Sequence, residues 1–312
     1  MNLQQLEYIV AVDRFKSFSK AAEACYITQA TLSTMVKRLE EELDMVIFDR
    51  KANPVITTDC GKELLREAQL AVHHANRMKQ LSAELKGIIE GELNIGIIPT
   101  VAGNLLHRIL PVILKKYPRL KLNIHETTTA NITARLKTNE LDAGIVSTPL
   151  NQQHLEEDVL YYEKLMVYGK SDKGTTKFKN PKNMAGENVW LLEKGNCLTD
   201  QIINVCALNT KSMHSNLNFH PNSFESLLNV VDNMKGLTLI PELYYLDLPK
   251  QRKKHVTDFV APYPVREISL VYHRPYAKLR LLNAVSDEIK RLIPPMLETG
   301  KLKNREMTIA KI

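Results

Sequence analysis

The spacing of apolar residues predicts a small helical domain over residues 1–58. Residues 3–12 have helical spacing, and a second short helix fits 19–25, with Ser17 or Ser19 as its N-cap. A third helix begins near Thr28, and its apolar residues recur at steps of three and four: Leu32, Val36, Leu39 and Leu43. Two short helices joined by a tight turn, with small and polar residues opening the second, are typical of a helix-turn-helix.

A hairpin, or wing, is expected next, from Val46 to Thr57, and then one long helix over residues 58–86. This helix carries an apolar stripe without proline, and at about 1.5 Å per residue it would be about 45 Å long. So long an apolar stripe needs another apolar surface to pack against. Pairing with a second copy of the chain satisfies this need, and packing onto its own domain is the alternative.

From residue 91 the pattern changes to alternating strands and helices, which indicates parallel βαβ units in two α/β lobes separated by a cleft. We expect residues 1–58 to form a winged helix-turn-helix and 59–90 a linker and dimerisation helix. Lobe I would comprise 91–163 and 268–300, and lobe II 164–267. The expected elements are strands at 92–98, 120–126, 143–146, 164–168, 189–192, 237–240 and 268–272 and helices at 101–116, 132–137, 198–208, 224–233 and 278–292. The charged tail after Pro294 is expected to be loosely ordered.

Composition narrows the class of protein. The 312 residues carry a net charge of +7, which is compatible with nucleic-acid binding, but residues 1–66 hold nine Lys/Arg against ten Asp/Glu. Any DNA contact there must depend on where the cations lie. Four scattered cysteines do not form a secreted disulfide framework, and no signal peptide or apolar run of about 18 residues is visible. We therefore expect a cytoplasmic protein that is neither exported nor membrane-spanning.

Two of these cysteines, Cys197 and Cys206, lie nine residues apart across one predicted helix. Nine residues of helix place the two sulfurs about 13 Å apart, on opposite sides, whereas a disulfide requires Cα atoms within about 7 Å. A bond between them would require this helix to unfold. Cys197 lies at the start of the helix, where unpaired N–H groups favour a thiolate. Cys206 falls on the apolar face and is expected to be covered.

Several linked motifs occur in a consistent order. They are Phe18-Ser19-Lys20-Ala21-Ala22, Ile27-Thr28-Gln29-Ala30-Thr31-Leu32-Ser33, Leu39-Glu40-Glu41-Glu42-Leu43 and Phe48-Asp49-Arg50. In these motifs the chain resembles the LysR-type transcriptional regulators over nearly its whole length. Asp44 stands where that family commonly ends the recognition helix with glycine, and an aspartate can adopt the left-handed conformation required there.

The segment 191–201 with Cys206, together with residues 96–101 and His125-Glu126, resembles the hydrogen-peroxide sensors of that family. The resemblance implies that peroxide oxidises Cys197 to a sulfenic acid, that Cys206 resolves it as a disulfide, and that a rearranged homotetramer activates antioxidant genes through RNA polymerase. Asn196 stands where these sensors often carry histidine, which leaves the peroxide sensitivity open.

The candidate peroxide pocket surrounds Cys197. The resemblance assigns Thr100 and Thr129 to it, at the ends of the first two strands of lobe I, and three local candidates join them: Asn196, Thr199 and Asp200. The alternative for the two threonines is that they only cap the helices that follow. No cofactor is implied, and the nine histidines show no metal-ligand spacing.

For double-stranded DNA, the side chains placed to reach base edges are Gln29, Thr31 and Thr34, and those placed to reach phosphates are Ser33, Lys37, Arg38 and Arg50. Arg38 can equally be part of a solvated face. Two other functions stay open: a regulator that binds a metabolite in the cleft with incidental cysteines, and a thiol peroxidase. The helix-turn-helix argues against an enzyme.

Overall fold

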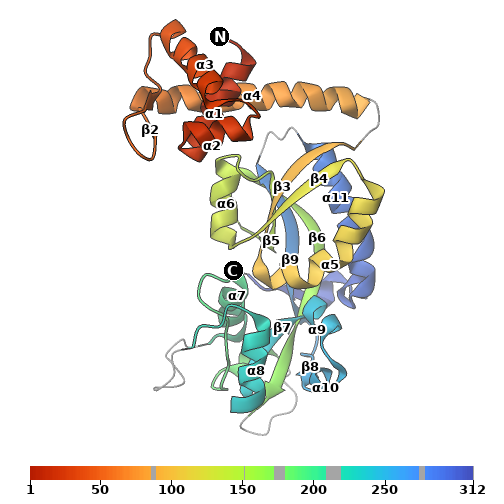
Figure 1. Cartoon of the computed structure of the whole chain (residues 1–312). Helices are drawn as coiled ribbons and strands as arrows, with labels where there is room; N and C mark the ends of the chain where they lie inside the picture. Colours follow the sequence, from red (N-terminus) through yellow and green to blue (C-terminus); the bar gives the residue numbers. More distant parts are fainter. Residues whose placement is uncertain (86–88, 151, 172–179, 209–218, 274–277, 312) are drawn as a thin grey trace. The chain divides into compact units, whose positions relative to one another are not determined.

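The computed structural model describes residues 1–85, 89–150, 152–171, 180–208, 219–273 and 278–311. The chain forms two compact units, Met1–Ile88 and Ile89–Ile312, and Figure 1 shows their elements. Within the described residues, no helix combines the length and the apolar character that a bilayer span requires.

The first unit begins with three short helices: α1 (Leu3–Phe15), α2 (Phe18–Ala24) and α3 (Gln29–Glu42). Each starts at a side chain that accepts a hydrogen bond from a backbone N–H of its first turn, namely Asn2, Ser17 and Thr28. The predicted helix-turn-helix is confirmed, and Ser17 rather than Ser19 caps its first helix.

The apolar stripe of α3 packs into the core of this unit, where Leu32, Val36 and Leu39 are fully buried. Asp44 has a φ of 49°, so an aspartate does adopt the left-handed conformation after the helix. A short antiparallel hairpin, β1 (Phe48–Asp49) and β2 (Ile56–Thr57), forms the expected wing. The long helix α4 (Asp59–Leu85) packs against α1, and its predicted end at Lys86 lies outside the described residues.

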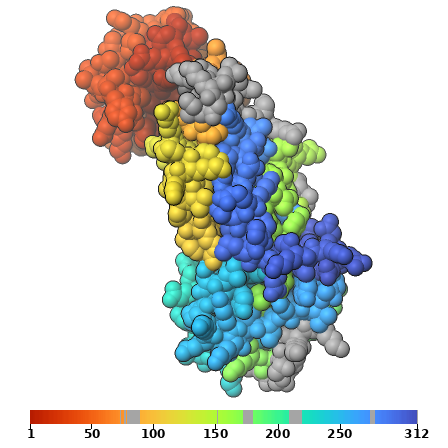
Figure 2. All heavy atoms as spheres, turned by 90° about the vertical axis from the view of Figure 1, so that its right-hand side faces the viewer, coloured from red at the N-terminus to blue at the C-terminus, as the bar shows by residue number. Residues whose placement is uncertain are grey.

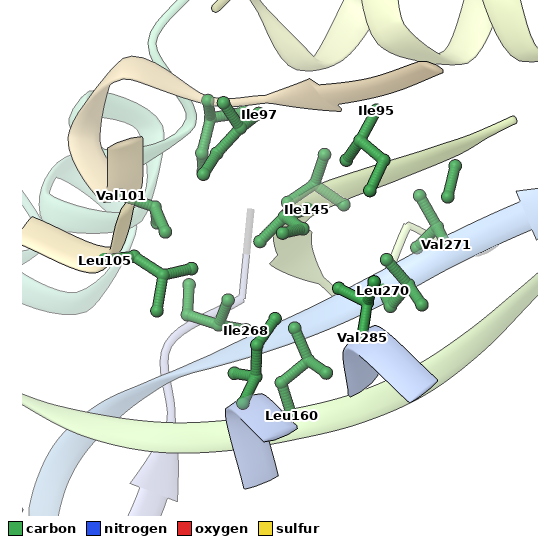
Figure 3. Close-up of a cluster of buried hydrophobic side chains, with 14 of the residues drawn as sticks. Ile95, Ile97, Val101, Leu105, Ile145, Leu160, Ile268, Leu270, Val271 and Val285 are labelled. Carbon is green, nitrogen blue, oxygen red and sulfur yellow. The ribbon is translucent and has the colours of Figure 1, made fainter. Parts of the chain in front are cut away.

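In the second unit, β3 (Gly91–Ile97) lies between β4 (Leu120–Glu126) and β5 (Ala143–Thr148), and both pairings are parallel. The predicted βαβ units are therefore confirmed in this first lobe. Its helices are α5 (Pro99–Lys116), α6 (Thr129–Lys137) and α11 (Leu279–Leu292). Figure 2 shows α11, in blue, alongside the yellow-orange segment that includes α5. Side chains from β3, β5, α5 and α11 meet in one buried cluster (Figure 3).

Two long strands, β6 (Leu155–Lys170) and β9 (Tyr263–His273), pair antiparallel and carry the sheet from the first lobe into the second. The strand order is β4-β3-β5-β9-β6-β7. Because β9 pairs with both β5 and β6, residues near its middle lie close to both lobes. Strands β6 and β9 are thus the crossover strands that join the two lobes.

The second lobe has its own buried apolar cluster. Its elements are α7 (Cys197–Cys206), α8 (Phe224–Met234), β7 (Gly236–Pro241), α9 (Glu242–Asp247), α10 (Lys250–Lys253) and β8 (Val256–Thr257). The expectation of parallel pairing is wrong here, because β7 and β8 both run antiparallel to β6. The strand expected at residues 189–192 is only an isolated bridge between Val189 and Leu237.

The expectation of a loosely ordered tail is also wrong. After α11, three short 3₁₀ turns lead to β10 (Met307–Ile309), which pairs in parallel with Tyr263, Pro264 and Val265 of β9. Ala310 is fully buried in the apolar cluster of the second lobe. The charged side chains of this tail suggested disorder. Its backbone is nevertheless ordered, because it forms hydrogen bonds with the unpaired edge of β9.

Candidate functional site

The helix α7 begins at Cys197 and ends at Cys206, so the two thiols occupy its two ends. Asn196 is the N-cap, and its side-chain oxygen accepts a hydrogen bond from the Leu198 N–H at 3.2 Å. Both cysteines are free thiols. An intact helix of this length holds their sulfurs about 13 Å apart, as the spacing predicted.

The two thiols are buried in different apolar cores. Cys197 is 5% exposed and belongs to the cluster of the first lobe. Cys206 is fully buried in the cluster of the second lobe beside Leu198 and Ile202, and its Sγ lies 3.8 Å from the Met184 Sδ. The expectation that Cys206 is covered is confirmed. Any reaction that joins the two sulfurs must remove at least one of them from its core.

Burial sets the acidity of both thiols. It raises the pKa of Cys197 above the ordinary value of 9.0, against three opposing effects: the positive charge of Arg266, the hydroxyl of Thr129 and the Leu198 N–H at the helix start. Burial alone raises the pKa of Cys206 to about 12. The helix N-terminus thus favours the Cys197 thiolate as expected, but desolvation exceeds this effect.

A cavity of about 110 Å³ opens beside Cys197. Thr129 lines it from the start of α6, and Asn196 and Cys197 line it from the start of α7. The Thr129 Oγ1 is buried next to the thiol and has no other hydrogen-bond partner among the described residues. The cavity can therefore offer a hydroxyl, an amide and a thiol to one small polar molecule.

The remaining predicted pocket residues do not line this cavity. Thr100 is buried, the Thr199 Oγ1 donates to the Leu192 carbonyl at 2.9 Å, and Asp200 is exposed. Neither Thr100 nor Thr129 caps its helix. The N-cap of α5 is Ile98, which makes no side-chain cap bond, and α6 is capped by Thr128.

A buried ion pair that was not predicted from the sequence binds Thr100 and places a positive charge near Cys197. The Arg266 Nε donates to the Glu163 Oε1 at 2.7 Å, and the arginine also donates to the Thr100 Oγ1 at 3.1 Å and to the Thr100 carbonyl at 2.9 Å. Both charged side chains are essentially inaccessible to solvent, at 1% and 0% exposure. Glu163 and Arg266 are direct partners in the β6–β9 register, and no local sequence pattern marks this pairing of distant strands.

The predicted DNA-contact residues gather on the exposed face of α3 and its flanks. Gln29, Thr31, Thr34 and Lys37 are exposed, and Ser33 is partly buried. The hydroxyls at the helix start are already engaged locally, since Thr31 Oγ1 lies 2.8 Å from Thr28 Oγ1 and Thr34 Oγ1 donates to the Ala30 carbonyl. Gln29 accepts a long hydrogen bond from Ser19 at 3.3 Å.

Arg50 joins the wing to the recognition helix. Its Nη1 donates to the Ser33 Oγ at 2.9 Å, its Nη2 lies 2.6 Å from the Glu40 Oε2, and its guanidinium lies over the Phe18 ring. Ser33 and Arg50 therefore lie together, as two phosphate contacts on one surface would require. Among the described residues, Lys37 makes only a long, exposed pair with Glu41, at 3.5 Å.

Comparison with protein families matches both units. Residues 3–62 match the family model described as "Bacterial regulatory helix-turn-helix protein, lysR family", and residues 86–293 match the "LysR substrate binding domain". Among curated relatives, the hydrogen peroxide-inducible genes activator of Haemophilus influenzae is 31% identical over 300 residues, which cover 94% of this chain and 99% of the relative. The dual regulator OxyR of Escherichia coli K12 is 31% identical over 285 residues, which cover 90% of this chain and 92% of that protein.

Solved structures agree with these relatives. A full-length OxyR variant from Pseudomonas aeruginosa superposes with a TM-score of 0.72 at 26% identity and covers 93% of this chain and 98% of its own. Reduced OxyR from Porphyromonas gingivalis gives a TM-score of 0.60 at 27% identity and covers 70% of this chain and 100% of its own. The order of the two matched domains and the similarity along nearly the whole chain show that this protein belongs to the LysR family of bacterial helix-turn-helix regulators.

Proposed function

We propose that this protein is a peroxide-responsive transcriptional activator, in which Cys197 is the oxidised residue and Cys206 resolves it. The observation that carries the proposal is the placement of Cys197 at a small polar cavity, at the start of a helix whose other end carries a second thiol in a different core. The relatives named as peroxide-inducible activators and OxyR support it.

The chemistry has two steps. The Cys197 thiolate attacks one peroxide oxygen, an S–O bond forms as the O–O bond breaks, and the leaving hydroxide takes up a proton to become water. The Cys206 sulfur then attacks the sulfenic sulfur of Cys197, and the S–O bond breaks as water leaves with the Cys206 proton. In the first step Thr129 and Asn196 would hold the peroxide, and Arg266 would stabilise the thiolate.

The size of the cavity argues for a small signal. Pockets for drug-sized ligands usually measure about 300–1,000 Å³, whereas this cavity measures about 110 Å³. A peroxide molecule fits such a space, and a larger metabolite would need the lobes to rearrange first. This favours a peroxide sensor over a metabolite-binding regulator.

The test is a peroxide titration of the reduced full chain and of a Cys197→Ser variant, followed by mass spectrometry. We expect a Cys197–Cys206 disulfide in the wild type at low micromolar peroxide and no oxidation of Cys206 in the variant. Absence of the disulfide in the wild type would refute the proposal. Repeated peroxide turnover with a thiol reductant would instead indicate a thiol peroxidase.

DNA binding would use α3 in a major groove, with α4 pairing two copies of the chain and a homotetramer acting on RNA polymerase. These proposed roles agree with the domain boundaries that we proposed from the sequence, namely 1–58, 59–90, 91–163 with 268–300, and 164–267. Gln29, Thr31 and Thr34 would reach base edges, while Ser33, Lys37 and Arg50 would contact phosphates. A cytoplasmic location follows from this proposed role at DNA.

Lys37 gives the clearest test of the DNA surface, because its ion pair with Glu41 is long and exposed. Lys37→Ala should weaken binding about equally for specific and unrelated duplexes, and should reduce the slope of log K against log salt by about 1. Fluorescence anisotropy at several salt concentrations measures both. Lys62→Ala, which removes an equally exposed lysine from α4, is the control. An unchanged salt slope for Lys37→Ala would contradict the assignment.

A further inference from the structure

The C-terminal strand β10 ends directly against the helix that carries both thiols. Strand β10 pairs with β9, and the Ala310 N–H continues this pairing by donating to the Val265 carbonyl at 2.7 Å. Ala310 is fully buried in the same apolar cluster as Leu198, Ile202 and Cys206. Figure 1 shows the chain end beside α7.

Two side chains of α7 bond to this segment. The Gln201 Nε2 donates to the Ala310 carbonyl at 2.7 Å and to the Ser147 Oγ at 3.0 Å, and Gln201 is fully buried. One turn further along, the Asn204 Nδ2 makes a longer contact of 3.5 Å with the Lys311 carbonyl. Both residues lie between Cys197 and Cys206, in the part of the helix that must change before the sulfurs can meet.

The end of α7 packs into the apolar cluster of the second lobe through Ile202 and Cys206, but its backbone ends in an unfavourable conformation. Ala207 follows Cys206 with a φ of 50°, and the left-handed conformation is unfavourable for a residue with a Cβ. The Lys311 and Ala310 carbonyls hold the last two turns from outside the helix. An isolated helix of 10 residues is too short to be stable, so α7 depends on tertiary contacts, and loss of these two would leave it held by its buried apolar face.

We propose that residues 310–311, carried by β10, act as a latch on α7 that must be released before Cys206 can reach Cys197. This rests on the proposed peroxide response. The latch acts on the second step only, because Cys197 meets peroxide at the cavity while α7 is still folded. Because β10 pairs with β9, the rate of disulfide formation would depend on β9, the strand that also carries Arg266.

The test uses a chain that ends at Ile309, which keeps the β10 pairing residues but removes both carbonyls and the buried Ala310 methyl. Lys311→Ala in the full chain is the matched control, because both carbonyls stay. Reduced proteins are mixed with peroxide, quenched with acid at set times and analysed by mass spectrometry for sulfenic Cys197 and for the disulfide. We expect the first step to stay within about twofold of the wild-type rate and the second to be about tenfold faster.

Hydrogen exchange of the reduced proteins gives a readout that needs no peroxide. The α7 amides should exchange about tenfold faster in the shortened chain, with the α11 amides unchanged. Asn204→Ala, in the full chain, should accelerate the second step two- to threefold, and it keeps the test valid if the shortened chain does not fold. Unchanged disulfide formation and α7 exchange would overturn the latch. Absence of Cys197 oxidation in the wild type, with faster α7 exchange in the shortened chain, would instead overturn the proposed function and leave the latch as a structural contact.

Discussion

Replacing Arg266 with methionine is expected to lower the free energy of unfolding of the second unit by about 3–5 kcal/mol. The variant leaves the Glu163 carboxylate fully buried without its counter-charge, and within the described part of the chain Glu163 then keeps only the bond from the Leu243 N–H, at 3.1 Å. It also removes both donors to Thr100. The loss of stability arises from the unpaired buried Glu163 charge rather than from the lost attraction between the two side chains. A second substitution that removes this charge should therefore restore most of it.

Urea denaturation followed by tryptophan fluorescence measures this effect, because Trp190 is the single tryptophan and is buried in the second lobe. The double variant Arg266→Met/Glu163→Gln should recover most of the loss, since no buried charge remains. Lys290→Met is the control: its pair with Asp158 is more than one-third exposed on the lysine side and should contribute less than about 1 kcal/mol. A loss for Arg266→Met no larger than that of the control would contradict the prediction.

The helix-turn-helix could be predicted from the sequence because its signals are local. The stripe of Leu32, Val36 and Leu39 fixes which face of α3 is buried, and Thr28 marks where the helix begins. The parallel strands of the first lobe follow in the same way from alternating strand and helix patterns. Strand direction in the second lobe did not follow, because β6 is one 16-residue strand whose direction is set by its pairing with β9, more than 90 residues away.

The residues of the candidate site also differ in whether a local sequence signal marks them. Cys197 was found because it opens a predicted helix, Asn196 because it precedes Cys197, and Thr129 through the family resemblance, and the structure brings them to one cavity. Arg266 and Glu163 were missed because neither has a local pattern, and their meaning lies in a register between distant strands. The ordered tail was missed for a similar reason, since an exposed sheet edge on β9 orders a charged segment that has no core-forming pattern of its own.

Cys206 is expected to react with iodoacetamide about a thousandfold more slowly in the folded protein than in urea. Burial raises its pKa from the ordinary 9.0 to about 12, and each unit reduces the fraction of reactive thiolate tenfold at a given pH. The experiment uses Cys197→Ser at pH 8, so that Cys206 is the remaining thiol of α7. Mass spectrometry follows alkylation site by site, and Cys60, which is exposed, serves as the internal control in the same sample.

The pH dependence of this labelling identifies its cause. A thiol whose folded pKa is about 12 gains thiolate tenfold per unit from pH 7 to pH 10, so labelling should rise over the whole range without a plateau. If Cys206 is labelled as fast as Cys60, the helix is already open in the reduced state, and burial does not protect the thiol. If labelling is slow and accelerates in urea, the resolving thiol is available only after α7 unfolds. Disulfide formation would then be limited by the stability of one 10-residue helix, so contacts with that helix, including those from the C-terminal segment, would set how quickly an oxidised Cys197 becomes a lasting signal.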